Sequence, residues 1–106
     1  MVLTRAHLDR YTNGQCHALA EALARLTGGT MVLCSDDDGA TGHCMTRVAG
    51  GFLDVTGLHT WEDMLALGWH ADDLTPVTSA EALGWEAPDL GEETFAVARA
   101  IAEGLR

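Results

Sequence analysis

The feature that most constrains this chain is a helix expected to begin just after Asn13, with a cysteine in its first turn. Asn13 is a favourable N-cap, because its side-chain oxygen can accept a hydrogen bond from a free N–H of the first turn. Mostly apolar residues recur at helical spacing and form one side of the predicted helix: Cys16, Leu19, Ala20, Leu23, Leu26 and Thr27. Gly28 and Gly29 should end the helix near Leu26. Cys16 is therefore predicted to point inward from the positive end of a helix.

The opposite side of this helix is predicted to face solvent: His17, Glu21, Ala24 and Arg25. The helix dipole alone does not make Cys16 a nucleophile. It stabilises a nearby anion by roughly 0.3–1 kcal/mol, which shifts the pKa of a thiol by about one unit at most. A strongly populated thiolate needs a cationic neighbour, usually a histidine. The rest of the chain must therefore supply an imidazole.

Length and charge limit the classes of protein that this chain can represent. Its 106 residues fit a single domain, 1–106, with one hydrophobic core. The net charge of −10 repels phosphate groups, so neither a nucleic acid nor an anionic membrane is an expected partner. A peptide or protein amide substrate is compatible with this charge. The sequence does not indicate an oligomeric state.

The expected location is the cytoplasm. Residues 1–7 lack the apolar stretch of a signal peptide, and no later stretch is apolar for long enough to span a bilayer. Three cysteines without a secretion signal are typical of reduced thiols.

The other elements are predicted from periodicity and turn signals. A short helix is expected over 4–11, with Thr4 as its cap and Leu8 and Tyr11 turned inward. Further expected elements are a buried strand over 31–34, a polar turn over 35–39, a helix over 60–67 with a Thr60–Asp63 capping box, an edge strand over 74–78, a helical turn over 78–83 and a helix over 91–103. The inner side of the last helix is expected to hold Phe95, Ala98, Ile101, Ala102 and Leu105. The predicted class is α+β, with the N-terminal helix packed on a small antiparallel sheet and a C-terminal helix.

A β-hairpin is the second informative stretch. Residues 43–48 and 52–56 flank Ala49-Gly50-Gly51, which is typical of a tight turn. If the turn takes two residues, either the first two or the last two of these three, Asp54 lies on the same face as His43. In the first of these registers the two side chains are diagonal neighbours within reach of each other. A three-residue turn would separate them, and we expect the two-residue turn.

Together these stretches supply the groups of a thiol hydrolase. Cys16 would attack a carbonyl carbon, His43 would take the thiol proton, and Asp54 would orient the imidazole. Backbone N–H groups at the helix start would face the developing oxyanion, with a side-chain donor from Gln15 or Asn13. This chemistry needs no metal and no cofactor, and we predict neither.

The same residues resemble known motifs. Tyr11-Thr12-Asn13-Gly14-Gln15-Cys16 resembles the nucleophile motif of CHAP domains, and Gly42-His43 at the start of a strand resembles the histidine motif of CHAP and NlpC/P60 enzymes. The step from His43 to Asp54 is similar to the NlpC/P60 spacing between the histidine and the third polar residue. This motif-level resemblance implies a minimal papain-like fold, in a superfamily that cleaves, deamidates or transfers amide bonds. It implies Cys16 as the nucleophile, His43 as the base and Asp54 as the orienting residue.

Two departures from these families concern the substrate more than the nucleophile. The connection 17–42 is much shorter than in CHAP domains, so the insert that builds their substrate groove is missing. His17 and Ala18 stand where the family has an aromatic residue after the cysteine.

Each candidate also has a simpler interpretation. A cysteine on an apolar helix face is usually a small buried hydrophobic residue. Cys34 and Cys44 are expected to be inert, because neither stands at a helix start. His59, just before a helix, is the alternative base. A zinc site made of the cysteines and His43 lacks the usual Cys-x₂-Cys spacing and is not predicted.

The remaining polar and aromatic residues are expected to be structural. The acidic turn over 35–39 resembles a calcium loop only faintly, because Arg47 stands where the closing glutamate would be. Three histidines are expected at the surface: His7, His17 and His70. Three tryptophans are expected to pack in the core or at its edge: Trp61, Trp69 and Trp85.

The sequence thus favours a small intracellular cysteine hydrolase acting on an amide bond: a peptidase, amidase or deamidase. The alternative is a catalytically inactive papain-like binding or inhibitor module, encoded for instance by a phage or a bacterium. The short connection between Cys16 and His43 favours this alternative, because it leaves little room for a substrate groove.

Overall fold

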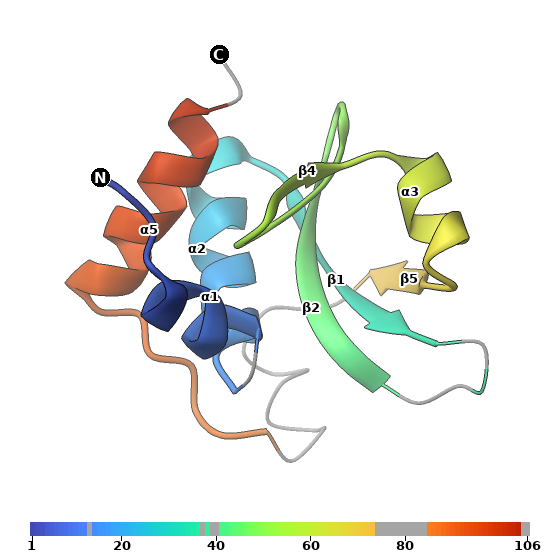
Figure 1. The fold of residues 1–106 in the computed structure, drawn as a ribbon, viewed down its shortest axis with the longest axis horizontal. Coiled ribbons are helices and arrows are strands. Elements are labelled where there is room, and N and C mark those ends of the chain that lie inside the picture. The colour runs from blue at the N-terminus through green and yellow to red at the C-terminus, as the bar shows by residue number, and fades with distance from the viewer. Residues whose placement is uncertain (13, 37, 39–40, 74–84, 105–106) are drawn as a thin grey trace.

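The computed structural model describes residues 1–12, 14–36, 38, 41–73 and 85–104, and it is α+β (Figure 1). The described elements are, in chain order, α1 (Arg5–Thr12), α2 (Cys16–Thr27), β1 (Thr30–Ser35), β2 (Thr41–Val48), β3 (Gly51–Asp54), β4 (Gly57–His59), α3 (Trp61–Ala66), β5 (His70–Asp73) and α5 (Glu92–Glu103). The strands form one antiparallel sheet in the order β4-β3-β2-β1-β5. The predicted α+β class with a small antiparallel sheet is confirmed. No helix of the described part is long and apolar enough to cross a membrane.

Helices lie on both sides of the sheet (Figure 1), and its two faces bury different side chains. On one face, α2 and α5 pack together over β3 in a cluster that includes Leu19, Leu23, Leu53, Val97 and Ile101. On the other face, Met64 of α3 packs with Val32, Cys34, Met45 and Phe52. Both faces of the sheet are therefore covered, and the first long helix packs on the sheet as predicted.

Helix α2 lies close to its predicted position, but its start differs in detail. The N-cap is Gln15, so the prediction of Asn13 as the cap is wrong, and Asn13 itself lies outside the described residues. Gly28 ends the helix as predicted, with φ at 74° and its N–H bonded to the carbonyl of Ala24. This left-handed angle favours glycine because a Cβ would be strained there.

The hairpin has the predicted two-residue turn. Val48 pairs with Gly51, which leaves Ala49-Gly50 as the turn and places His43 and Asp54 on one face. The second strand is shorter than predicted, because β3 ends at Asp54 rather than at residue 56.

The chain reverses again directly after β3. Gly57, with φ at 112°, opens β4, a strand that the sequence did not predict. β4 pairs with β3, with His59 opposite Phe52. The reversal therefore brings His59 back beside the hairpin.

Helix α1 confirms the predicted helix over 4–11. The backbone N–H of His7 donates to the hydroxyl of Thr4 at 3.3 Å, which confirms Thr4 as the cap. Tyr11 is fully buried, and its hydroxyl lies 2.8 Å from that of Thr94 in α5. Leu8 is exposed instead of turned inward, so that part of the prediction is wrong.

The second half of the chain is predicted correctly where the periodicity is strong. The capping box of Thr60 and Asp63 is present at the start of α3. Helix α5 confirms the helix over 91–103, and its buried residues are Thr94, Val97, Ala98 and Ile101. β5 was not predicted. The strand over 74–78, the helical turn over 78–83 and Leu105 lie outside the described residues.

The tryptophans pack at the edges of the core. Trp69 and Trp85 are half-buried. Trp61 is exposed, but one side of it meets the Phe52 ring edge-on at 4.9 Å. The expected packing at the edge of the core is thus met for Trp69 and Trp85, and for Trp61 through its contact with Phe52.

Candidate active site

Cys16 is the first residue of α2, and only 6% of it is exposed. It packs with Ala20, Met31 and Cys44 between the helix and the sheet. The N–H of Leu19 bonds to the carbonyl of Gln15 at 3.2 Å. The N–H groups of the residues before Leu19 therefore have no acceptor within the helix, and they give its start a positive character.

β2 brings His43 to the start of α2 through an irregularity in the sheet. Consecutive residues of β1 pair with His43 and Thr41, so Gly42 is an extra residue in β2. A bulge of this kind re-aims the neighbouring side chains. Gly42 also fits because a Cβ there would lie 3.2 Å from the ring of Trp69.

His43 lies between the thiol of Cys16 and the carboxylate of Asp54. Its Nε2 is 2.9 Å from Oδ2 of Asp54. The Cys16 side chain lies close enough to the ring to raise the pKa of His43. Because Nε2 faces the carboxylate, Nδ1 is the nitrogen left for the thiol. The structure thus brings the three predicted residues together in the order that proton transfer from the thiol requires.

The electrostatics of the three groups favour a charged pair. Burial lowers the pKa of His43, but its hydrogen bonds to Asp54 and Cys16 outweigh burial and raise the pKa to about 9. Burial raises the pKa of Asp54, but His43 and Thr56 outweigh it and hold the pKa at about 2. The pKa of the Cys16 thiol is lowered by a hydrogen bond from Cys44 and by His43, against the effect of burial. These shifts favour a thiolate beside an imidazolium near neutral pH.

Asp54 is held on its other oxygen by the β3–β4 turn. Oδ1 accepts the backbone N–H of Thr56 at 2.8 Å and also the Thr56 hydroxyl. Nε2 of His59 lies 3.2 Å from the same oxygen and 2.6 Å from the Thr56 hydroxyl. His59, the alternative base, is therefore placed behind Asp54 and not beside Cys16.

Cys44 lies beside Cys16, although the sequence predicted an inert residue at this position. Strand alternation turns it toward α2, where it packs against Cys16 and lowers the pKa of that thiol. This contact raises the pKa of Cys44 itself, because a second thiolate beside the first is unfavourable. The one signal available was its position directly after His43 in an alternating strand.

Replacing Cys44 with alanine is expected to move the inflection of the pH profile for alkylation of Cys16 by iodoacetamide upward by about one unit. A hydrogen bond to a charged group contributes about 1.5–3 kcal/mol, and part of that loss should be replaced by solvent. Cys34→Ala is the matched control, since Cys34 is equally buried but lies in the cluster on the other face. The same inflection in both variants would contradict the role of Cys44.

The Gln15 side chain has a different partner from the one predicted. Its Nε2 donates to the carboxylate of Glu86 and the carbonyl of Ala87, and its Oε1 accepts the N–H of Asp89 at 2.8 Å. Both amide hydrogens are thus taken by the segment before α5. The predicted use of Gln15 as an oxyanion donor is a poor fit to this geometry, and Gln15 instead ties that segment to the start of α2.

His17 is fully buried, so its predicted surface position is wrong. Its Nε2 lies 2.7 Å from the carbonyl of Glu86, and its ring meets Trp85 edge-on at 5.3 Å. Glu21, one turn further along, is also buried and lies 3.4 Å from Arg25. The segment before α5 therefore covers His17, on a helix face whose composition is typical of solvent exposure.

The other two surface histidines are more accessible. His70 is exposed, as predicted. His7 is half-buried, with Nε2 3.3 Å from the carboxylate of Glu93.

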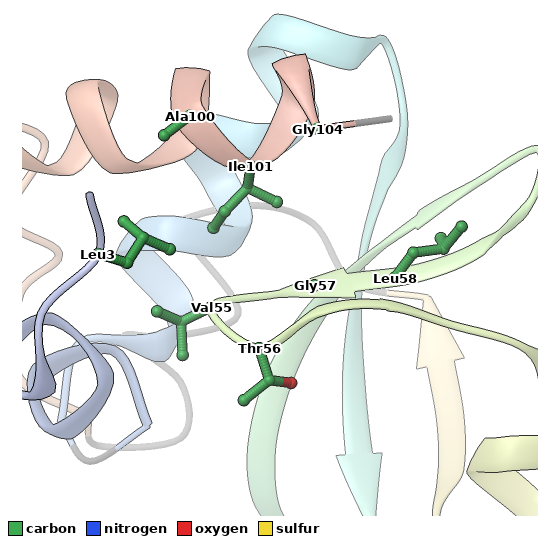
Figure 2. A pocket seen from close by; sticks show the side chains of 8 residues that line it. All are labelled: Leu3, Val55, Thr56, Gly57, Leu58, Ala100, Ile101 and Gly104. Carbon is green, nitrogen blue, oxygen red and sulfur yellow. The ribbon is translucent and has the colours of Figure 1, made fainter. Parts of the chain in front are cut away.

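Two cavities lie near the hairpin. One of about 120 Å³ is lined by His43, Met45, Asp54, Thr56, His59, Met64, Leu67 and Trp69. A larger one of about 400 Å³ lies between α5 and the β3–β4 turn, where Leu3, Val55 and Ile101 point toward one another (Figure 2). The lining of the larger cavity shares only Thr56 with the first and includes none of the three candidate catalytic residues. In the described part of the chain, no three His, Cys, Asp or Glu side chains are arranged to hold a metal ion.

Comparison with known proteins adds no further evidence: no family model, curated protein or solved structure matches the chain.

Proposed function

We propose that this chain is a small cysteine hydrolase with a minimal papain-like fold, which attacks an amide bond through Cys16, His43 and Asp54. The single observation that carries the proposal is the position of His43, whose Nε2 is 2.9 Å from the Asp54 carboxylate and whose pKa is also raised by the nearby Cys16 side chain. A structural histidine needs one such partner. A thiol at a helix start and a buried carboxylate on the two sides of one imidazole are what general-base activation requires.

Each group has a defined task in the proposed reaction. The Cys16 sulfur attacks the carbonyl carbon, and the free backbone N–H groups at the start of α2 stabilise the oxyanion. His43 then gives a proton to the leaving amine, and the C–N bond breaks to leave a thioester. Asp54 stabilises the imidazolium throughout. In the second half, His43 takes a proton from water, which attacks the thioester and frees the thiolate.

The binding or inhibitor module remains the second candidate, and one observation favours it. Only 6% of Cys16 is exposed, so a substrate carbonyl has little direct access to the sulfur. A module that kept the framework without turnover would have the same three residues in place. Cytoplasmic location is part of the first proposal, because a reducing compartment keeps the three free thiols reduced.

Alkylation by iodoacetamide, followed residue by residue with mass spectrometry, tests the proposed function. Cys16 is expected to react at least about tenfold faster than Cys34 and Cys44 at pH 6, because an ordinary thiol of pKa about 8.5 is almost fully protonated there. The pH profile of Cys16 should inflect well below about 8.5. His43→Ala should move that inflection upward. If Cys16 reacts no faster than the other two cysteines, the enzyme proposal fails.

A further inference from the structure

Two of the three cysteines lie in one small cluster between α2 and the sheet. Cys16, at the start of α2, and Cys44, in β2, pack there with Ala20 and Met31. Both cysteines are buried, and both are thiols. The proposed hydrolysis uses the sulfur of Cys16 and assigns no bond-making step to Cys44. A second nucleophilic group is therefore placed against the reactive sulfur without a part in that reaction.

The two thiols differ in the way that a redox-active pair requires. The pKa of Cys16 is lowered by Cys44 and by His43, so Cys16 is the thiol that favours the thiolate, which is the form that oxidants attack. The pKa of Cys44 is raised, first by Cys16 and then by burial. Oxidation of Cys16 to a neutral sulfenic acid would remove the negative charge that holds this pKa up. Cys44 would then lose its proton more easily and could attack.

The sheet register excludes a bond between Cys44 and the third cysteine. Cys34 pairs with His43 across β1 and β2, and Cys44 pairs with Leu33. Because side chains alternate along a strand, Cys34 and Cys44 point to opposite faces of the sheet, and Cys34 packs in the cluster under α3. Two cysteines whose side chains point apart cannot be bridged without movement of the backbone. Cys16 is thus the partner that Cys44 can bridge, and a residue at a helix end can shift at low cost.

The burial of Cys16 selects a small oxidant. Only 6% of Cys16 is exposed, which leaves a peptide carbonyl little access to the sulfur. Hydrogen peroxide is scarcely larger than water and needs far less room. It is also neutral, so the net charge of −10 does not repel it. Hydrogen peroxide therefore fits this site better than a bulky or anionic oxidant.

We propose that Cys16 and Cys44 form a redox-active dithiol, in which hydrogen peroxide oxidises Cys16 and Cys44 then closes a reversible disulfide. The Cys16 sulfur attacks one peroxide oxygen, the O–O bond breaks, and the hydroxide that leaves takes the proton of the His43 imidazolium. The Cys44 sulfur then attacks the sulfur of the sulfenic acid, and the Cys44 proton leaves with the hydroxyl group as water. One peroxide is reduced to two waters, while two thiols become one disulfide.

Reduction of the disulfide closes the cycle. A small cellular thiol would attack one of the two sulfurs, form a mixed disulfide and be displaced by a second thiol, which returns both cysteines to the reduced state. Transient disulfides of this kind are the ones found in reducing compartments. None of these steps involves an amide bond, so the inference goes beyond the proposed function.

Disulfide mapping tests the proposal. The reduced protein is treated with hydrogen peroxide, remaining thiols are blocked with N-ethylmaleimide in urea, and the chain is digested without reductant. Trypsin together with a protease that cuts before aspartate releases each cysteine on its own peptide, because Arg25 stands between Cys16 and Cys34 and Asp36 between Cys34 and Cys44. We expect a Cys16–Cys44 bridge that dithiothreitol removes, with Cys34 recovered as its N-ethylmaleimide adduct.

Two variants isolate the part played by Cys44. Cys34→Ala is the matched control and should form the bridge at the native rate, since Cys34 lies on the other face of the sheet. Cys44→Ser keeps a polar hydrogen at nearly the same size but cannot form a disulfide, so Cys16 should remain a sulfenic acid that dimedone traps. Capture by Cys44 is intramolecular, and the native protein should therefore give at least about tenfold less dimedone adduct than Cys44→Ser.

Peroxide treatment in urea shows whether the fold selects the bond. In the unfolded chain the shorter loop between Cys34 and Cys44 closes more readily, so the preference for Cys16–Cys44 should be lost. A Cys34–Cys44 bridge in the folded protein would overturn the proposal. Equal dimedone labelling of Cys16 in the native protein and in Cys44→Ser, or no oxidation of Cys16 at all, would overturn it as well.

The outcomes also separate this proposal from the proposed function. If iodoacetamide alkylates Cys16 fastest of the three cysteines but peroxide yields no Cys16–Cys44 bridge, the dithiol fails and the hydrolase proposal stands. If the bridge forms in a protein that cleaves no amide bond, the hydrolase proposal fails and the dithiol stands.

Discussion

Replacing Asp54 with alanine is expected to lower the proposed amide-bond turnover by about 10²- to 10⁴-fold and to slow alkylation of Cys16 at pH 6 by about tenfold or more. The carboxylate is the partner that raises the pKa of His43 to about 9 against the effect of burial. Without it, burial dominates and the imidazole loses its charge near neutral pH. The Cys16 thiolate then loses its cationic neighbour.

The pH profile gives an independent readout of the same change. In the native protein the thiolate–imidazolium pair exists above the lowered pKa of Cys16 and below the pKa of His43, which is about 9. Turnover should therefore decline as the pH rises through about 9. In Asp54→Ala this decline should begin at lower pH, because the pKa of His43 falls when an opposite charge is removed.

Two controls separate a catalytic effect from a structural one. Asp54→Asn keeps the size and one acceptor oxygen but removes the charge. Its turnover and its rate of Cys16 alkylation should therefore lie between those of the native protein and of Asp54→Ala. Asp9→Ala, at an exposed position of α1, should leave both the turnover and the alkylation rate unchanged. Circular dichroism must show Asp54→Ala to be folded; an unfolded variant would mark Asp54 as structural and contradict the prediction.

The part of the site that follows from the sequence depends on local rules. A two-residue turn fixes the register of a hairpin, and alternation then fixes which side chains share a face. For this reason the pairing of His43 with Asp54 could be predicted from residues 43–56 alone. The position of Cys16 in the first turn of a helix likewise follows from periodicity, and the end of that helix follows from Gly28, although the cap is Gln15 and not Asn13.

The part that could not be predicted depends on contacts between distant segments. Cys44 meets Cys16 only because α2 packs on β2. The segment that contains Glu86 buries His17 and occupies the Gln15 amide, although nothing near these residues in the sequence indicates a cover. Polar composition only makes exposure to solvent more common, and a distant segment that packs on such a face buries it.

Replacing Gly51 with alanine is expected to lower the melting temperature by about 10 °C or more and to remove the fast alkylation of Cys16. Gly51 has φ at 141°, and a Cβ there would lie 2.2 Å from the backbone oxygen of His59. The strained backbone costs about 1–3 kcal/mol, and each kcal/mol lowers the melting temperature by about 4–8 °C in a domain of this size. The clash must move β4 away from β3, which adds to that cost.

Gly50→Ala is the matched control, because Gly50 and Gly51 are neighbours in one hairpin and differ in the space around an added Cβ. A Cβ at Gly50 would lie 3.7 Å from Leu58, which is ordinary contact. Its melting temperature and alkylation rate should therefore stay close to native. Gly51→Ala should lower the melting temperature and slow the alkylation of Cys16. The position of Asp54 depends on the register of β3 and on the hydrogen bond from Thr56 in the turn into β4. If the two variants behave alike, the close approach of β3 and β4 does not position the carboxylate that orients His43.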